Sequence, residues 1–176
     1  DTALELAVRH SIVPMIFYSV EPDNVPKSIM DKINSILFRS LTLSENQIYY
    51  IKQISSVFEE NGIDFVLLKG SVLKNMYPSS DMRVMGDADI LIKTEQYERI
   101  KPILEKIGFF EQKECDPEIV WNIPGLHLEL HKSLFAKRNS DFYAYFGDGW
   151  KNAVPVYGKK HTYTLTPEAN LVYLIA

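Results

Sequence analysis

Two aspartates stand close together in residues 86–92, Gly-Asp-Ala-Asp-Ile-Leu-Ile. If this segment is a strand, Asp87 and Asp89 point to the same side of the sheet, because side chains alternate along a strand. Neighbouring carboxylates repel each other, and a divalent cation removes that penalty. Mg²⁺ commonly binds through one or two carboxylates together with substrate phosphates. A metal site is favoured over a solvated strand end, because the apolar run that follows places the pair beside the core.

A glycine-serine pair follows a short apolar run in residues 67–71, Leu-Leu-Lys-Gly-Ser. Glycine lets the backbone approach a ligand closely, and a helix that starts here offers free N–H groups to an anion. Lys69 could add a positive charge and Ser71 a hydroxyl, as in a phosphate site. Taken alone, the pattern is better explained as a plain turn between a strand and a helix.

A third candidate lies in residues 126–132, where leucines alternate with His127, Glu129 and His131. Alternation of this kind places the three polar side chains on one face of a strand and the leucines on the other. Three interpretations stay open. Glu129 could be a third carboxylate beside the aspartates, the trio could bind zinc on its own, or the strand could simply have a solvated polar face.

Arg83 lies in the loop before Asp87, where its fork of donors could reach a phosphate. Such an arginine more often pairs with a neighbouring carboxylate, here Asp81. Neither Cys115 nor the tyrosines form a convincing nucleophile constellation. The sequence contains no P-loop, no Gly-x-Gly-x-x-Gly and no nucleophile elbow.

Composition limits the class of protein. The chain has 176 residues, of which 46% are hydrophobic and 24% charged, as expected for one globular unit with a real core. The single cysteine excludes an internal disulfide and a cysteine-based zinc cage. A net charge of −4 argues against extended nucleic acid as a partner but leaves a small anionic ligand open.

Neither a bilayer-spanning run of ~18 apolar residues nor a signal peptide is found, so we expect a cytoplasmic protein with no membrane partner. The chain starts without Met and ends in the apolar run 171–176, which suggests a piece of a longer protein.

The elements that must position these residues follow from the spacing of apolar side chains. Helical spacing covers residues 4–16, 29–41 and 48–58; the last two form one long helix or two, because the Ser- and Thr-rich stretch 40–46 separates them. Asn61 and Gly62 then predict a helix end. The strands expected after Gly62 lie at 63–68, 87–92, 118–123, 126–131 and 161–165. A short helix is expected at 72–77, and a second helix from its cap Thr94 to Lys106, ended by Gly108. A last helix is expected to begin at Thr166-Pro167-Glu168.

This order predicts an α+β fold. We expect an N-terminal helical region at residues 1–61, followed at residues 62–176 by a small mixed β-sheet with flanking helices, truncated at its C-terminus.

Taken in order, Lys69-Gly70-Ser71, Asp87-Ala88-Asp89 and a later-strand Glu129 resemble the nucleotidyltransferase superfamily, which has the polymerase β-like fold. The sequence of these segments is most similar to one branch of the superfamily, the uncharacterised bacterial nucleotidyltransferases. Members of that branch have segments similar to Val66–Leu73, Tyr77, Glu129-Leu-His131 and Arg9-His10 of this chain. They also have an Arg followed by the pattern Asp-x-Asp-Leu-Leu-Val. The resemblance spans residues 6–176, although the gap between Ser71 and Asp87 is longer than in many superfamily members.

The resemblance implies that Asp87, Asp89 and Glu129 are the catalytic, metal-binding carboxylates. Gly70 and Ser71 would hold the nucleotide phosphates, with Lys69 and Arg83 as further phosphate-binding candidates. It implies Mg²⁺, with Mn²⁺ as an alternative, an NTP donor with ATP preferred, and a small-molecule or protein acceptor that bears a hydroxyl. Two other hypotheses remain: a non-catalytic nucleotide-binding or antitoxin-like partner-binding module on the same fold, and a zinc hydrolase built on His127, Glu129 and His131.

Overall fold

A computed structural model describes residues 2–176 and shows one mixed sheet of seven strands, in the order β3-β4-β5-β2-β1-β7-β6. The strands are β1 (Phe65–Leu67), β2 (Ala88–Ile92), β3 (Phe110–Cys115), β4 (Glu118–Ile123), β5 (Leu126–His131), β6 (Ala153–Pro155) and β7 (Thr162–Leu165). β1 pairs with β7 and β2 with β5 in parallel, while the other neighbouring pairs are antiparallel. The predicted α+β class with a mixed sheet is confirmed.

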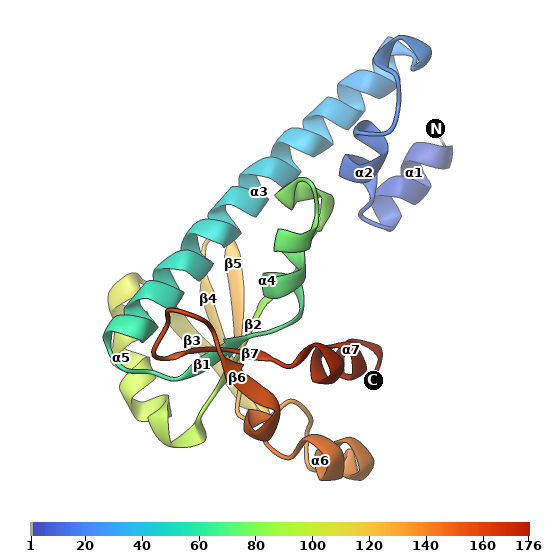
Figure 1. Cartoon of the computed structure of the whole chain (residues 1–176). Helices are drawn as coiled ribbons and strands as arrows, with labels where there is room; N and C mark the ends of the chain where they lie inside the picture. The colour runs from blue at the N-terminus through green and yellow to red at the C-terminus, as the bar shows by residue number, and fades with distance from the viewer. Residues whose placement is uncertain (1) are drawn as a thin grey trace.

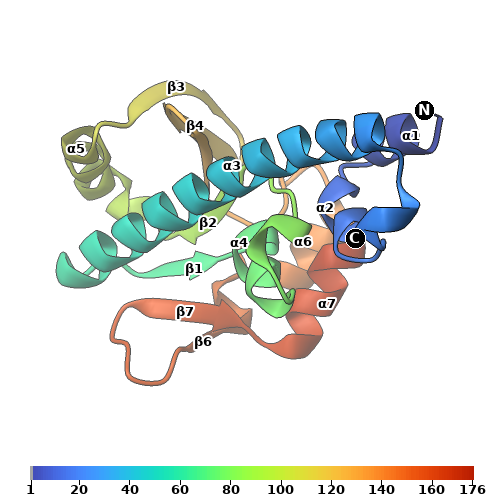
Figure 2. The ribbon, with the colours of Figure 1, turned by 90° about the horizontal axis from the view of Figure 1, so that it is seen from above.

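Helices cover both faces of this sheet (Figures 1 and 2). The helices are α1 (Thr2–Arg9), α2 (Val13–Phe17), α3 (Lys27–Glu60), α4 (Lys69–Leu73), α5 (Tyr97–Ile107), α6 (Ser140–Phe146) and α7 (Pro167–Ile175). Short 3₁₀ turns lie at Pro22–Asn24 (η1), Lys74–Met76 (η2), Ser80–Met82 (η3), Thr94–Gln96 (η4) and Trp150–Asn152 (η5). The C-terminal part of α3 and α5 pack on one face, here called the α3 face, and α6 and α7 pack on the other, the α7 face.

The long helix α3 answers the question left open by the sequence, because it is one helix rather than two. Its polar middle is buried and hydrogen-bonded. The Gln47 amide donates to the backbone carbonyl of Met85 at 2.8 Å, and the Ser44 hydroxyl donates to Ser80 at 3.1 Å. The Ser- and Thr-rich stretch is therefore a helical surface that contacts the loop before β2, and not a turn.

The ends of α3 pack differently from its middle. Near its start, Ile33 packs with Ala7 of α1 and Val13 of α2 in a small apolar cluster. Near its end, Ile54 and Phe58 lie in the main core against the sheet. The helix therefore runs from the N-terminal helices to the sheet (Figure 1), and the predicted domain division at residue 61 stays a prediction.

Most predicted elements are present, some with different bounds. The strands at 118–123 and 126–131 are confirmed, as are the helix end at Asn61 and Gly62 and the Thr166 cap, whose hydroxyl accepts from the Ala169 N–H. The strand predicted at 63–68 is shorter, and the helix predicted from residue 72 already starts at Lys69. Gly108 ends α5 in the left-handed conformation, as predicted.

Three expectations fail for local reasons. The N-terminal stripe is split into α1 and α2 at Ser11, which has a φ of 55°. Thr94 does not cap a helix, because it begins the 3₁₀ turn η4 before α5. The sequence also missed β3, β6 and α6; all six residues of β3 are exposed, so it lacks the apolar alternation that marks a half-buried strand.

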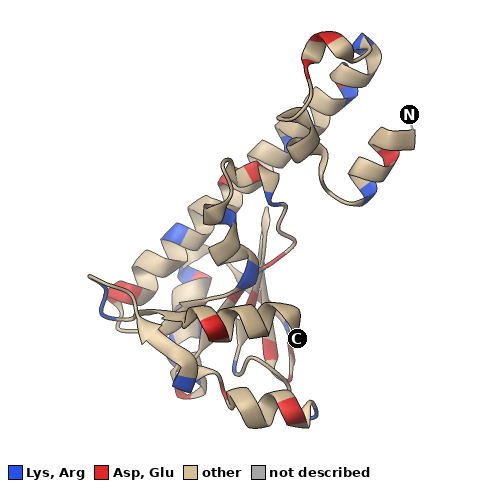
Figure 3. Ribbon diagram, turned by 45° about the vertical axis from the view of Figure 1, so that its right-hand side comes forward, with Lys and Arg blue, Asp and Glu red and all other residues tan. Residues whose placement is uncertain are grey.

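Among residues 2–176, no helix is both long enough and apolar enough to cross a membrane. Figure 3 shows basic and acidic residues interspersed along the ribbon, on helices and strands alike.

Candidate metal centre

The centre of the sheet brings two predicted carboxylates together. β2 and β5 are neighbours, and their parallel register places Asp89 directly beside Glu129. Ala88, Ile90 and the β5 leucines face the main core under α3 and α5. Asp89 and Glu129 alternate with them and therefore lie on the α7 face, which confirms the predicted alternation along β5.

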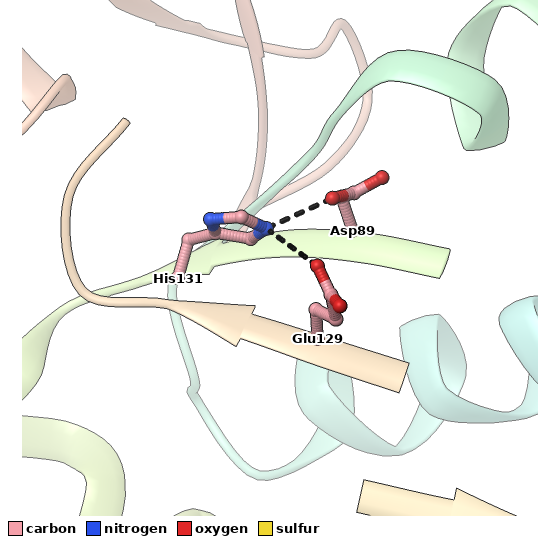
Figure 4. Close-up of side chains that lie close together, drawn as sticks. All are labelled: Asp89, Glu129 and His131. Atoms are coloured by element: carbon pink, nitrogen blue, oxygen red, sulfur yellow. Dashed lines mark hydrogen bonds and ion pairs between the residues drawn. The ribbon is translucent and has the colours of Figure 1, made fainter. Parts of the chain in front are cut away.

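His131 joins this pair from the end of β5. Its Nε2 atom and Asp89 Oδ1 are hydrogen-bonded at 2.9 Å, and the same nitrogen lies 3.7 Å from Glu129 Oε2 (Figure 4). The side chains of Asp89 and His131 are 1% and 2% exposed, so bulk water screens this contact little. Within the described part of the chain, these three residues form the group whose ligand atoms all lie within 4.8 Å of one another.

Lys69, the first residue of α4, supplies the positive charge at this site. Its ammonium donates to Asp89 Oδ1 at 2.7 Å. The Lys69 backbone has a φ of 43°, an uncommon conformation for a residue other than glycine. Burial alone would lower the pKa of Lys69, but the hydrogen bond and charge of Asp89 outweigh it and raise the pKa above its ordinary value. Lys69 therefore stays charged beside the carboxylates.

The two carboxylates have opposite pKa shifts. Burial alone would raise the pKa of Asp89, yet the hydrogen bonds from His131 and Lys69 hold it below the usual 3.8. Burial raises the pKa of Glu129, and repulsion from the Glu118, Asp87 and Asp89 charges adds to it. Asp89 is thus the carboxylate stabilised as an anion, while Glu129 is the one that gains most from an added cation.

Tyr173 of α7 is a neighbour of the site that the sequence analysis missed. The Lys69 ammonium lies 5.9 Å from the centre of its ring. Burial, together with the Asp89 charge, raises the pKa of Tyr173 to about 12 despite the opposing effect of Lys69. The tyrosine is embedded in the apolar run 171–176, whose sequence carries no signal of a polar neighbour.

Asp87 and His127 lie at the margin of the cluster. Asp87 comes directly before β2 and acts on Glu129 and Lys69 through its charge. His127 Nε2 lies 3.8 Å from Glu129 Oε1, while its Nδ1 atom is hydrogen-bonded to Asn122 at 2.6 Å. His131 is hydrogen-bonded to Asp89, so its imidazole lies with the Asp89 and Glu129 carboxylates rather than in a pair with His127.

The other candidate phosphate-binding residues lie on the α3 side of α4. Gly70 packs against Met85, because a Cβ at this position would come within 2.8 Å of Met85 Cγ. The Ser71 hydroxyl is 3.9 Å from Met85 Sδ. Arg83 lines a small cavity with Asp81 and does not join the Asp89 cluster.

The donor set fits a divalent cation. Two carboxylates suit Mg²⁺, and an added imidazole nitrogen also suits Mn²⁺ or Zn²⁺. The hydrogen bonds of Asp89 to Lys69 and His131 both use Oδ1. In Figure 4 the second carboxylate oxygen of Asp89 points away from His131. That oxygen and the Glu129 carboxylate are the groups available to a cation.

Comparisons with known proteins identify the family of the chain. The family model of the uncharacterised nucleotidyltransferases matches residues 1–176. No curated protein matches the sequence.

Two solved structures of ANT(2'')-Ia match part of the chain. The solution structure of this antibiotic-resistance factor is 18% identical, with a TM-score of 0.45, over 50% of this chain and 47% of that one. The crystal structure with adenylyl-2''-tobramycin is 17% identical, with a TM-score of 0.43, over 48% of each chain. The match thus spans about half the length of those proteins.

Proposed function

This chain belongs to the family of uncharacterised nucleotidyltransferases, and from that premise we propose that it transfers an NMP group from an NTP, with ATP as the preferred donor. The acceptor is a hydroxyl-bearing small molecule or protein side chain, and the reaction depends on Mg²⁺, with Mn²⁺ as an alternative. The observation that carries the proposal is the side-by-side placement of Asp89 and Glu129 on β2 and β5, with the Lys69 ammonium 2.7 Å from Asp89.

In this proposal Asp89 and Glu129 hold the cation, and Asp87 joins them from the residue before β2. A bound Mg²⁺ supplies neutralisation of phosphate charge and a lower pKa for the attacking hydroxyl. His131 orients Asp89 through the 2.9 Å hydrogen bond, so the carboxylate keeps one direction. The pKa of Glu129 is raised by burial and by repulsion from neighbouring carboxylates, and a bound cation would relieve both effects.

The phosphates are bound next to this cluster, at the start of α4. Lys69 pairs with Asp89 before the donor binds and turns its ammonium to the phosphates afterwards, where charge-assisted hydrogen bonds are strong. Gly70 and Ser71, on the α3 side of α4, are further candidates for contact with the phosphates, although the Ser71 N–H already donates to the Leu68 carbonyl at 3.1 Å. Arg83 is the outermost candidate. Positioning and electrostatic stabilisation supply most of the rate acceleration in a reaction of this kind. The cytoplasm, where NTPs are abundant, is the proposed location.

The test measures metal binding and transfer in the same variants. Mn²⁺ binding followed by electron paramagnetic resonance, and pyrophosphate release from each NTP with hydroxyl acceptors, are compared for the wild type, Asp89→Asn and Glu129→Gln. The matched control is Asp31→Asn, which removes an exposed carboxylate near the start of α3. Both site variants should lose Mn²⁺ binding and pyrophosphate release, and the control should keep them.

The result that contradicts the proposal is unchanged Mn²⁺ affinity in Asp89→Asn. Nucleotide binding that needs Asp89 but never leads to pyrophosphate release would instead favour the non-catalytic module. Stoichiometric zinc in the purified protein, lost in His131→Ala and His127→Ala, would favour the hydrolase.

A further inference from the structure

Lys69 brings a positive charge of the chain itself to a carboxylate that the proposed cation would use. Its ammonium lies 2.7 Å from Asp89 Oδ1, and the Asp89 side chain is 1% exposed. Solvent therefore screens the attraction between the two charges only weakly. Asp89 is already largely neutralised by this ion pair before any metal ion binds.

The ion pair compensates only one half of the two-carboxylate site. The basic neighbours of Glu129 are the imidazoles of His127 and His131, at 3.8 Å and 3.7 Å. Burial and repulsion from nearby carboxylates raise the pKa of Glu129, whereas the hydrogen bonds from His131 and Lys69 lower the pKa of Asp89. Glu129 thus favours an added cation, while the partner of Asp89 opposes one.

The backbone of Lys69 is held in place, whereas its side chain reaches solvent. The Leu68 N–H donates to the backbone carbonyl of Asp89 at 3.0 Å, and the Ser71 N–H donates to the Leu68 carbonyl at 3.1 Å. Lys69 has the uncommon φ of 43°, a conformation that persists where the surrounding structure enforces it. Its side chain is nevertheless 41% exposed. The ammonium can therefore leave Asp89 by side-chain rotation alone, without a movement of α4.

A divalent cation at Asp89 and Glu129 would bring further positive charge next to this ammonium. Like charges repel strongly where water is scarce. Asp89 Oδ1 is shared by two partners, Lys69 and His131, but the His131 side chain is 2% exposed and has no route to solvent. Lys69 is therefore the partner that gives way when a cation binds.

We propose that Lys69 is a built-in competitor of the metal ion: its ammonium pairs with Asp89 in the free protein, a divalent cation displaces it, and the displaced ammonium binds the phosphates of the nucleotide. Metal ion and nucleotide then bind with positive coupling, because both favour the same released position of Lys69. The cost of breaking the ion pair keeps metal affinity low until a nucleotide is present. This inference rests on the proposed function, since it takes Asp89 and Glu129 as the metal ligands.

The test measures Mn²⁺ binding by electron paramagnetic resonance with no nucleotide present. Lys69→Met should bind Mn²⁺ about tenfold more tightly than the wild type, because the competing charge is gone. Lys69→Arg keeps the charge and should stay within about threefold of the wild type. The matched control is Lys93→Met, which removes a lysine paired with Asp64 at 2.6 Å outside the Asp89 cluster and should change the affinity less than about twofold.

A second titration separates competition from a general loosening of the site. In calorimetry with metal-free ATP in EDTA, Lys69→Met should bind about tenfold more weakly than the wild type, since its contact with the phosphates is lost. The variant thus gains affinity for one ligand and loses it for the other. A site that is merely disordered would lose affinity for both.

Three results would overturn the inference: unchanged or weaker Mn²⁺ binding in Lys69→Met, equal tightening in Lys93→Met, or equal tightening in Lys69→Arg. Asp89→Asn shows which proposal has failed. If it loses Mn²⁺ binding while Lys69→Met does not tighten it, only the competition is wrong; if Asp89→Asn binds Mn²⁺ unchanged, the proposed function is wrong as well. Circular dichroism and urea unfolding establish that each variant is folded, and Lys69→Gln replaces Lys69→Met if the latter is not.

Discussion

Lys69 and Lys74 lie on the same short helical segment, yet their surroundings are opposite. Lys69 is 41% exposed in its side chain and has a carboxylate partner at 2.7 Å, whereas Lys74 is 4% exposed and contacts uncharged acceptors. The pKa of Lys69 is raised by Asp89 against the effect of burial, while burial lowers the pKa of Lys74.

Solvation alone would favour the reverse arrangement, with the buried lysine paired and the accessible one left to water. Lys69 forms an ion pair with Asp89 at the candidate metal centre. The Lys74 ammonium is bonded to uncharged acceptors, and the Asp81 and Glu45 charges act on it through space.

The largest expected difference concerns nucleotide binding. Lys69→Met should weaken MgATP binding about 10- to 100-fold, because one charge-assisted hydrogen bond to a phosphate is lost. Lys74→Met should change it less than about threefold, since the Lys74 ammonium contacts Gln47 of α3 and the Arg83 carbonyl, away from the Asp89 cluster. Calorimetric titration of MgATP into both variants measures this contrast, and Lys69→Arg should recover part of the affinity. Equal losses in both methionine variants would mean that one anion site spans both lysines.

The same two variants should differ in stability. Lys69→Met leaves Asp89 buried with His131 alone, and we expect the free energy of unfolding to fall by about 1–3 kcal/mol; the partial exposure of Lys69 keeps this below the cost for a fully buried pair. In Lys74→Met the relief of burying a charge offsets two lost hydrogen bonds, so the change should be under about 1 kcal/mol.

Urea unfolding monitored by circular dichroism measures both free energies. A larger loss in Lys74→Met than in Lys69→Met would contradict the contrast and indicate that Asp81 and Glu45 compensate Lys74 in full.

Gly70 lies between the two lysines and offers a purely steric test of how α4 is fixed. A Cβ there would meet Met85 Cγ at 2.8 Å and Sδ at 2.9 Å, so Gly70→Ala should lower the free energy of unfolding by about 1–2 kcal/mol. The matched control is Gly86→Ala, where an added Cβ meets nothing within 4 Å and the change should stay under about 0.5 kcal/mol. If both alanine variants are equally stable, Met85 moves aside freely and does not hold α4.

Local patterns in the sequence predicted part of the candidate site, and strand order determined the rest. The alternation along residues 126–131 is local, so it correctly placed Glu129 and His131 opposite the leucines. That Asp89 lies beside Glu129 depends on strand order, which no local pattern encodes. Here the ordered resemblance to a known family, rather than the spacing, linked the two residues.

The position of Tyr173 near Lys69 and the burial of Lys74 both depend on long-range packing, so the sequence did not predict them. Tyr173 reaches the site only because α7 folds back onto the α7 face, and Lys74 is buried only because α3 continues without a break past the loop before β2. The Ser- and Thr-rich stretch of α3 looked like a possible turn, since its buried polar partners lie far away in sequence. The metal-binding and phosphate-binding roles themselves stay predictions.

The smallest expected effect is a pH dependence that separates the two lysines by sign. The pKa of Lys74 in the folded protein lies below the ordinary 10.5, so at pH values between the two the unfolded chain binds more protons. In that range the contribution of Lys74 to the free energy of unfolding rises with pH. For Lys69 the folded pKa lies above 10.5, so its stabilising contribution is fully present below 10.5 and is lost as pH rises through the folded value.

Urea unfolding of the wild type and both methionine variants at increasing alkaline pH measures these contributions, with Lys113→Met as the exposed-lysine baseline. Relative to Lys74→Met, the wild type should gain stability as the pH approaches 10.5. Relative to Lys69→Met, it should keep a constant advantage over the same range and lose it only above 10.5. Parallel curves for the two variants would contradict the contrast and mean that the surroundings compensate both ammonium groups alike.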